Sequence, residues 1–330
     1  MPIPLLRLPL LVLDEVIKSV GFRQLFLLSL CSKRINLVVK NLRDKSIKFT
    51  LSLRVGRRIV IRLMAENERD ETLTVAVRAM PEVHREGLRS GQFGGALFQA
   101  GRFKLRIYLV YVEGGAISLI GYMSDLFCAP INDVTINDNR FFWMLDWIEK
   151  RQGPRSYQAS MYDEHNKLTD EQCRHLLIDL RPSKFLVNTP FESFQVENPD
   201  ENFQGITWSH GNWLTIENLL TIDCNRLTVY NPTFTVIEIN RFFRHVLIDG
   251  GAPRLACFVG RLKSNHENEI ILDGVREMLT PIRGEERSGG SGGSWKISGT
   301  LNREDRTAFV SIKYLRMERQ PVIYFEETGV

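Results

Sequence analysis

The stretch LLRLPLLVLDEVIKSVGFRQLFLLSLCSKRINLVV, from Leu5 to Val39, is far richer in apolar residues than a short surface segment needs to be. Its apolar residues recur at spacings of three and four, which is the period of an amphipathic α-helix. Pro9 suits the first turn of such a helix, because the N–H that proline lacks would have no partner there. Gly21 ends this helix, and Ser32 can cap a third one. The stretch therefore predicts three short helices.

Three helices of this size are too small to bury a hydrophobic core of their own. Their surplus apolar face must be covered, either by the body of the same chain or by a partner protein. A membrane is not the expected cover, because Arg7, Pro9 and the pair Asp14-Glu15 keep the stretch short of the roughly 20 apolar residues that cross a bilayer. A signal peptide would need an uninterrupted apolar core and a small-residue cleavage site, and acidic residues stand there instead.

The whole chain has the composition of a globular protein, with 330 residues of which 43% are hydrophobic and 25% are charged. Its 43 basic and 39 acidic residues leave a net charge of +4, which is too small to indicate a nucleic-acid partner. The five cysteines are odd in number and form no C-x-x-C pair, which argues against a disulfide framework and against a zinc site. These features favour a reducing compartment, cytoplasmic or nuclear.

Residues 46–133 form a β-rich segment, in which period-two alternation and β-branched runs replace the helical period. Strands are expected at residues 47–51, 59–63, 73–77 and 105–110, and glycines such as Gly114-Gly115 are expected to form turns between them. The glycines around Gly91 lack the G-x-x-x-x-G-K spacing of a phosphate loop. A group of arginines is interpreted as charge on a solvated strand edge that discourages pairing between sheets: Arg54, Arg57, Arg58 and Arg62.

From residue 134 to residue 275, helices alternate with short strands. We expect helices at residues 141–148, 168–180 and 237–248, and strands at residues 157–161, 184–187, 219–224 and 254–259. The strand centres recur at intervals of about thirty residues, as in helix–strand repeats stacked side by side. Each repeat would place a strand on an inner face and a helix outside, like a degenerate leucine-rich repeat. The fold class expected for the chain is therefore α+β.

The N-terminal residues resemble an F-box of the kind found in the large nematode F-box families. The resemblance is carried by Leu8-Pro9, by the runs 12–17 and 25–30, and by the tail Cys31-Ser32-Lys33-Arg34. It implies a three-helix F-box at residues 3–45 that docks on the Skp-type adaptor of a cullin ubiquitin ligase. The adaptor-binding residues that it implies are Leu8, Pro9, Val12, Leu13, Val16, Ile17, Leu25 and Leu28.

A second resemblance lies in the C-terminal half. The segments WLTIENLLTIDC (213–224), INRFFRH (239–245) and GGAPRL (250–255) look like the type 2 F-box-associated domain, at about residues 205–270. The C-terminal region 295–330 contains Trp295–Ile312, which is similar to the closing β-hairpin of that family. Residues 288–294 form a flexible Gly/Ser tract, either natural or an inserted linker.

Repeat folds use their inner face for recognition, which makes four residues candidates for substrate binding: Asn225, Arg226, Thr228 and Tyr230. Trp143 and Trp147 lie four residues apart on one helix face, either as core or as a binding hot spot.

No arrangement of reactive side chains indicates catalysis. Asp163-Glu164-His165 lies in a polar loop, and His175 belongs to the surface of the next helix without metal-ligand spacing. Cys224 beside Asp223 is expected to pack as a small hydrophobic residue. We therefore expect a non-catalytic chain without a cofactor or a metal: the substrate-recognition subunit of a Skp–cullin–F-box ubiquitin ligase. The alternatives are a protein-interaction module with a degenerate F-box and an enzyme in the β-rich segment.

Overall fold

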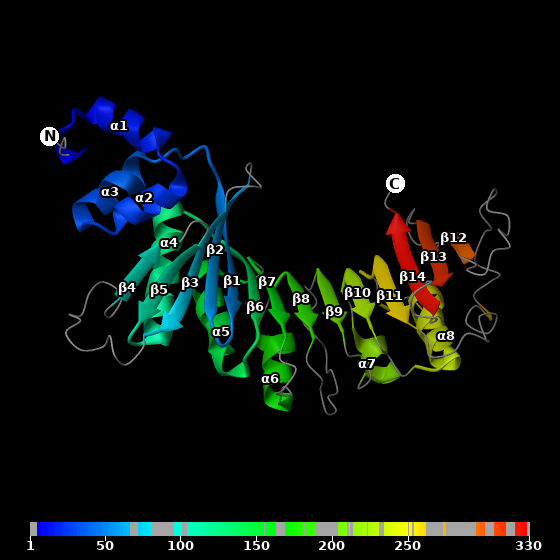
Figure 1. Ribbon diagram of the computed structural model, residues 1–330. Helices are drawn as coiled ribbons and strands as arrows, with labels where there is room; N and C mark the ends of the chain where they lie inside the picture. Colours follow the sequence, from blue (N-terminus) through cyan, green and yellow to red (C-terminus); the bar gives the residue numbers. More distant parts are fainter. Residues whose placement is uncertain are drawn as a thin grey trace. The chain divides into compact units, whose positions relative to one another are not determined.

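The computed structural model describes residues 5–66, 72–80, 96–100, 104–154, 156–162, 169–180, 182–188, 204–209, 211, 214–222, 224–230, 234–249, 251–252, 254–261, 273–274, 295–300, 307–314 and 321–328 (Figure 1). The chain divides into two compact units, Met1–Asn137 and Asp138–Val330. Within the described ranges, none of the helices is both long enough and apolar enough to cross a membrane.

The N-terminal stretch folds into the three predicted helices. A single 3₁₀ turn, η1 at Leu5–Arg7, precedes α1 at Leu10–Ser19, α2 at Phe22–Ser29 and α3 at Lys33–Leu42. Pro9 is the residue just before α1, and Ser32 caps α3 because its side chain accepts a hydrogen bond from the Ile35 backbone N–H (3.1 Å).

A mixed sheet with the strand order β6-β1-β2-β3-β5-β4 forms the rest of the first unit. Its strands are β1 at Phe49–Val55, β2 at Ile59–Ala65, β3 at Thr72–Ala79, β4 at Ala96–Ala100, β5 at Lys104–Leu109 and β6 at Ile131–Ile136. Burial alternates along β1 and β2, so one face of the sheet is buried and the other is open. The interpretation of Arg54 and Arg62 as strand-edge charges is wrong, because β1 and β2 are interior strands and these arginines belong to the open face.

A helix that was not predicted, α4 at Val112–Phe127, packs against β3 and β5 on the buried face. It includes Gly114 and Gly115, which were expected to form a turn. Apolar residues at helical spacing outweigh the low helix propensity of the two glycines, since all of the following are buried: Ala116, Leu119, Ile120, Met123, Leu126 and Phe127.

The second unit contains the predicted helix–strand repeat. Five strands pair in parallel in chain order: β7 at Gln158–Met161, β8 at Lys184–Val187, β9 at Gly205–Trp208, β10 at Arg226–Val229 and β11 at Cys257–Arg261 (Figure 1). Its helices are α5 at Trp143–Gln152, α6 at Asp170–Arg174, α7 at Ile216–Thr221 and α8 at Val236–Arg244. A 3₁₀ turn precedes α5, η3 at Asn139–Phe141, and α6 and α8 continue into π-helical turns, η4 at His175–Asp179 and η6 at His245–Asp249.

The strand expected at residues 219–224 is wrong. Residues 219–221 are the end of α7, and β10 begins at Arg226. A short apolar run fits a strand or a buried helix equally well, and the cap decides between them here. The Thr215 side chain accepts a hydrogen bond from the Asn218 backbone N–H (3.3 Å), which starts a helix before the apolar run is reached.

Three antiparallel strands close the second unit: β12 at Trp295–Thr300, β13 at Thr307–Tyr314 and β14 at Pro321–Thr328. In the β12–β13 hairpin, Trp295 lies opposite Ile312, as the expected closing hairpin requires. β14 pairs with both β13 and β11 and so joins the hairpin to the parallel strands. The Gly/Ser tract at residues 288–294, the glycines around Gly91 and the loop Asp163-Glu164-His165 lie outside the described residues. The expected α+β fold class is confirmed.

Candidate docking surfaces

Four large apolar side chains that are exposed in the described part of the first unit belong to its N-terminal helices, and a fifth, Tyr111 just before α4, is 74% exposed. Leu10, Leu11 and Val12 follow one another at the start of α1 and are 68%, 81% and 46% exposed, and Leu37 on α3 is 58% exposed. We call these four residues the N-terminal apolar surface. Neighbouring apolar side chains left in water are typical of a surface that a partner covers.

The eight residues predicted to bind an adaptor divide by burial. Pro9 and Val12 are exposed, and Leu8, Val16 and Leu28 are partly exposed. The remaining three are buried in the fold of the chain itself: Leu13, Ile17 and Leu25. These three can support the shape of a docking surface, but they offer no area to a partner. The residues implied by the F-box resemblance did not include the exposed Leu10, Leu11 and Leu37.

Aromatic contacts attach the N-terminal helices to the sheet of the same unit. The ring of Phe22 on α2 lies 5.5 Å from that of Phe49 on β1, and Phe49 lies 5.2 Å from Phe127 at the end of α4. Phe26 makes an edge contact with Tyr122 on α4, at a centroid distance of 6.2 Å. The body of the chain therefore covers α2, while the N-terminal apolar surface stays open.

A hydrogen-bonded chain crosses the same junction. Asn36 Nδ2 donates to the Tyr122 hydroxyl (2.7 Å), which donates to Ser29 Oγ (2.7 Å), which in turn donates to the Phe26 carbonyl (2.6 Å). Burial is the main reason why the pKa of Tyr122 is raised, so this phenol keeps its proton and its place in the chain. Arg43, which is 5% exposed, donates through Nε to the Leu126 carbonyl in the last turn of α4 (2.9 Å).

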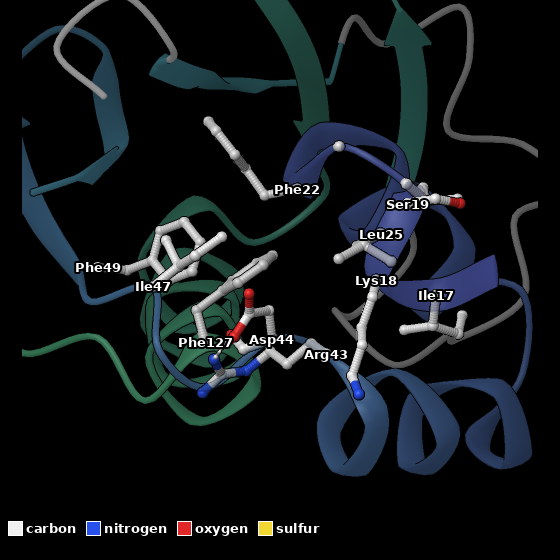
Figure 2. A pocket seen from close by; sticks show the side chains of 12 residues that line it. Ile17, Lys18, Ser19, Phe22, Leu25, Arg43, Asp44, Ile47, Phe49 and Phe127 are labelled. Atoms are coloured by element: carbon white, nitrogen blue, oxygen red, sulfur yellow. Dashed lines mark hydrogen bonds between the residues drawn. The ribbon is translucent and has the colours of Figure 1, made fainter. Parts of the chain in front are cut away.

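A cavity of about 200 Å³ lies at this junction (Figure 2). Its walls are mainly apolar, and its polar rim is formed by Lys18, Arg43 and Asp44. Lys18 is paired with Asp14 (2.6 Å). The Asp44 carboxylate accepts hydrogen bonds from the hydroxyl and the backbone N–H of Ser46, and these bonds lower its pKa. Each of the three rim side chains therefore already has a partner within the chain.

In the second unit, the parallel register leaves one face of the sheet open. Positions 159, 185, 206, 227 and 258 form one row across the strands, and all five side chains in it are buried. The next row along the strands belongs to the other face and is largely half-buried: Ser160, Leu186, Thr207, Thr228 and Val259. An open strand face is the arrangement that repeat proteins use for recognition.

The predicted substrate-binding residues lie at and around one central strand of this open face. Asn225 and Arg226 are exposed at the start of β10, and Tyr230, just after the strand, is half-buried. Thr228 is only 8% exposed, because it sits between the neighbouring strands β9 and β11. Three of the four residues are thus accessible, and Thr228 lies between them with little exposed area.

Reactive groups are few among the residues that the structure describes. No group of three or more His, Cys, Asp or Glu side chains there could hold a metal ion. Cys224 is buried, as expected for a packing residue. Trp143 and Trp147 are half-buried, and the Arg151 guanidinium lies 5.7 Å from the Trp147 ring.

His175 was expected to be an ordinary surface residue, but it lies between two carboxylates. Its Nδ1 is 2.8 Å from Asp179 Oδ2, and its Nε2 is 3.0 Å from Asp146 Oδ1 on α5. Burial lowers the pKa of His175, but hydrogen bonds and charge from Asp179 and Asp146 outweigh it, so the pKa is raised above its usual value. The imidazolium form therefore ties η4 to α5.

This arrangement predicts a stability that depends on pH. Because the folded-state pKa of His175 is raised, its contribution should be complete below about pH 6.5 and should be lost as the pH rises through the folded-state pKa. We expect the free energy of unfolding to fall by up to about 1 kcal/mol over that rise, given the partial exposure of the site. Urea denaturation at acidic and alkaline pH measures this.

Replacing His175 by Gln should remove the difference. His245 holds the matching position in η6 without an ion pair to any described carboxylate, so His245→Gln is the control and should preserve the difference. An unchanged pH difference in His175→Gln would contradict the assignment.

Comparison with known families identifies two parts of the chain. A model of the F-box domain matches residues 5–47, and a model of the F-box-associated domain matches residues 199–259. The F-box and the type 2 F-box-associated domain expected from the sequence are thereby confirmed, whereas the likeness to the nematode families stays a prediction. No curated protein and no solved structure matches the chain.

Proposed function

We propose that this chain, which carries an N-terminal F-box and an F-box-associated domain, is the substrate-recognition subunit of a Skp–cullin–F-box ubiquitin ligase. F-box domains generally bind Skp-type adaptors. The observation that carries the proposal is the N-terminal apolar surface, because all four of its residues fall within the segment that the F-box model matches. The fold leaves that surface in water, so an adaptor that covered it would remove its apolar area from water, which favours binding.

The mechanism that this role implies is proximity. The F-box holds the adaptor and, through it, a cullin, while the body holds a protein substrate. Holding both together raises the local concentration of a substrate lysine near a ubiquitin-carrying enzyme. The chain itself contributes no reacting group to this mechanism, in keeping with the generally non-catalytic nature of F-box and F-box-associated families.

The open sheet face of the second unit is the surface that we propose for the substrate. It includes β9 and β10, which lie in the segment matched by the F-box-associated model. Arg226 offers a charged contact there and Tyr230 offers a ring, and Asn225 offers a polar contact just before the strand. Thr228 is nearly buried, so it would affect the shape of the sheet surface and would contribute little contact area.

Size-exclusion chromatography of the full-length chain mixed with a Skp-type adaptor tests the proposal. We expect the two proteins to elute as one complex and to take up a cullin when it is added. The full-length chain is required, because α2 and Arg43 belong to the core of the first unit and a chain that starts at Ser46 would lack them. Separate elution of a folded chain would overturn the proposal and leave the protein-interaction module with a degenerate F-box.

A further inference from the structure

The open face of the first unit's sheet carries a group of arginines. They come from four adjacent strands, and we call them the basic face: Arg54 on β1, Arg62 on β2, Arg78 on β3 and Arg106 on β5. Arg54, Arg62 and Arg106 are exposed, and Arg78 is half-buried. The turn between β1 and β2 adds two more exposed arginines at positions 57 and 58.

The strand register places these arginines close to one another. Arg54 on β1 lies opposite Val60 on β2, and Arg62 is two residues after Val60 on β2. The two arginines are therefore diagonal neighbours on adjacent strands, at roughly 7–8 Å. Val60 lies opposite Ala76, which lies opposite Arg106. Arg54 and Arg106 therefore share one row, three strand spacings or about 14 Å apart.

Within the described residues, no ion pair neutralises the positive charge of this face. None of its four arginines forms an ion pair within the part of the chain that the structure describes. Arg106 Nη1 donates to the neutral Gln99 side chain (3.4 Å). The strand register places the Asp133 carboxylate on β6 close to Arg54, but its Oδ2 accepts a hydrogen bond from Ser52 Oγ (2.9 Å). Unpaired like charges at this spacing repel one another, and an anionic partner would remove that repulsion.

The excess of positive charge belongs to the first unit as a whole. Residues 1–137 hold 20 Lys and Arg against 12 Asp and Glu, a net charge of +8. Residues 138–330 hold 23 against 27, a net charge of −4. The modest net charge of +4 for the chain thus conceals a strongly basic unit, which attracts acidic partners over a distance of about one Debye length.

We propose that the basic face binds an acidic segment of a partner protein, in which carboxylates or phosphates lie on alternate residues. In an extended peptide, alternate side chains on one side are about 6.8 Å apart, which is close to the diagonal spacing of Arg54 and Arg62. Guanidinium groups bind carboxylate and phosphate groups through paired hydrogen bonds. A basic face would bind such a segment whether or not the chain is a subunit of a ubiquitin ligase, so this proposal does not depend on the proposed function.

The residues of this face favour a protein over a nucleic acid. Proteins that bind single-stranded nucleic acid stack the bases on several aromatic side chains as well as contacting phosphates. Among the described residues on the strands of the basic face, Tyr108 is the one aromatic side chain that is not buried. Several exposed arginines beside a single accessible aromatic side chain match an acidic polypeptide better than a nucleic acid.

Fluorescence anisotropy with the full-length chain provides the test. The probes are a labelled peptide of alternating Glu and Ser, a peptide with phosphoserine in place of Glu, a Gln version of the first peptide, and a single-stranded RNA of equal charge. We expect one or both anionic peptides to bind, the Gln peptide to fail, and binding to weaken as salt is added. The tighter of the two anionic peptides identifies carboxylate or phosphate as the preferred group.

The double variant Arg54→Gln/Arg62→Gln should weaken peptide binding by at least about fivefold. The control is Lys40→Gln/Lys45→Gln, which removes the same charge from two exposed positions of the same unit and should have less than about a twofold effect. Equal losses in both variants, or no binding of either anionic peptide, would overturn the proposal. Tighter binding of the RNA would replace the acidic protein by a nucleic acid. Adaptor binding by the arginine variant, measured in parallel, keeps this result separate from the proposed function.

Discussion

Replacing Leu11 by Asp should abolish measurable binding of a Skp-type adaptor while leaving the chain folded. Leu11 is 81% exposed, so the folded chain loses almost no contact when the side chain changes. Burying a leucine under a partner gains about 1.5–3 kcal/mol, and an aspartate in its place would add the cost of removing a charge from water. A total loss of about 3 kcal/mol or more corresponds to over a hundredfold in affinity. Titration calorimetry measures the affinity, and thermal unfolding checks the fold.

The matched control is Ile237→Asp on α8, where an apolar side chain of similar size is 72% exposed in the second unit. We expect that variant to bind the adaptor as the unmodified chain does. If Leu11→Asp bound with unchanged affinity, the N-terminal apolar surface would not be the docking site. Leu13→Asp cannot replace Leu11→Asp in this experiment, because Leu13 is 6% exposed and its replacement would disturb the fold as well.

Elements with a strong period were predicted from the sequence, whereas those with competing signals were missed. The three N-terminal helices and strands such as β2 and β8 followed from clear spacing of apolar residues. Helix α4 was missed because Gly114 and Gly115 indicate a turn locally, and the buried face of the sheet that stabilises the helix is a tertiary feature. Helix α7 was missed because its apolar run has no period of its own and depends on the cap at Thr215.

The candidate sites show the same division. The location of the F-box could be predicted, since its sequence pattern is local, but the set of apolar side chains that its fold leaves exposed could not. Leu10, Leu11 and Val12 form an unbroken apolar run, and only the packing of α2 against α4 decides which side of the N-terminal helices is left open. The basic face was missed for a related reason: whether Arg54 and Arg62 stand on an edge or on an interior strand depends on pairing with β3 and β6.

Replacing Phe26 by Ala should destabilise the first unit by about 3–5 kcal/mol, which is the usual cost of removing a large buried aromatic side chain. Phe26 is fully buried and contacts the Tyr122 ring across the junction between α2 and α4. Hydrogen exchange on the full-length chain measures the effect. We expect amide protection to fall in α1–α3 and in α4 together, because the two sides share one core.

Phe243→Ala on α8 is the control, since Phe243 is equally buried but belongs to the core of the second unit and should leave α1–α4 protected. Loss of protection in α1–α3 with α4 unchanged would contradict the shared core and mark the F-box as an independent domain. Leu11 lies on α1, which packs against α3, while α2 and α3 contact Tyr122 on α4. A change in α4 that loosens those contacts should therefore weaken adaptor binding without touching the adaptor.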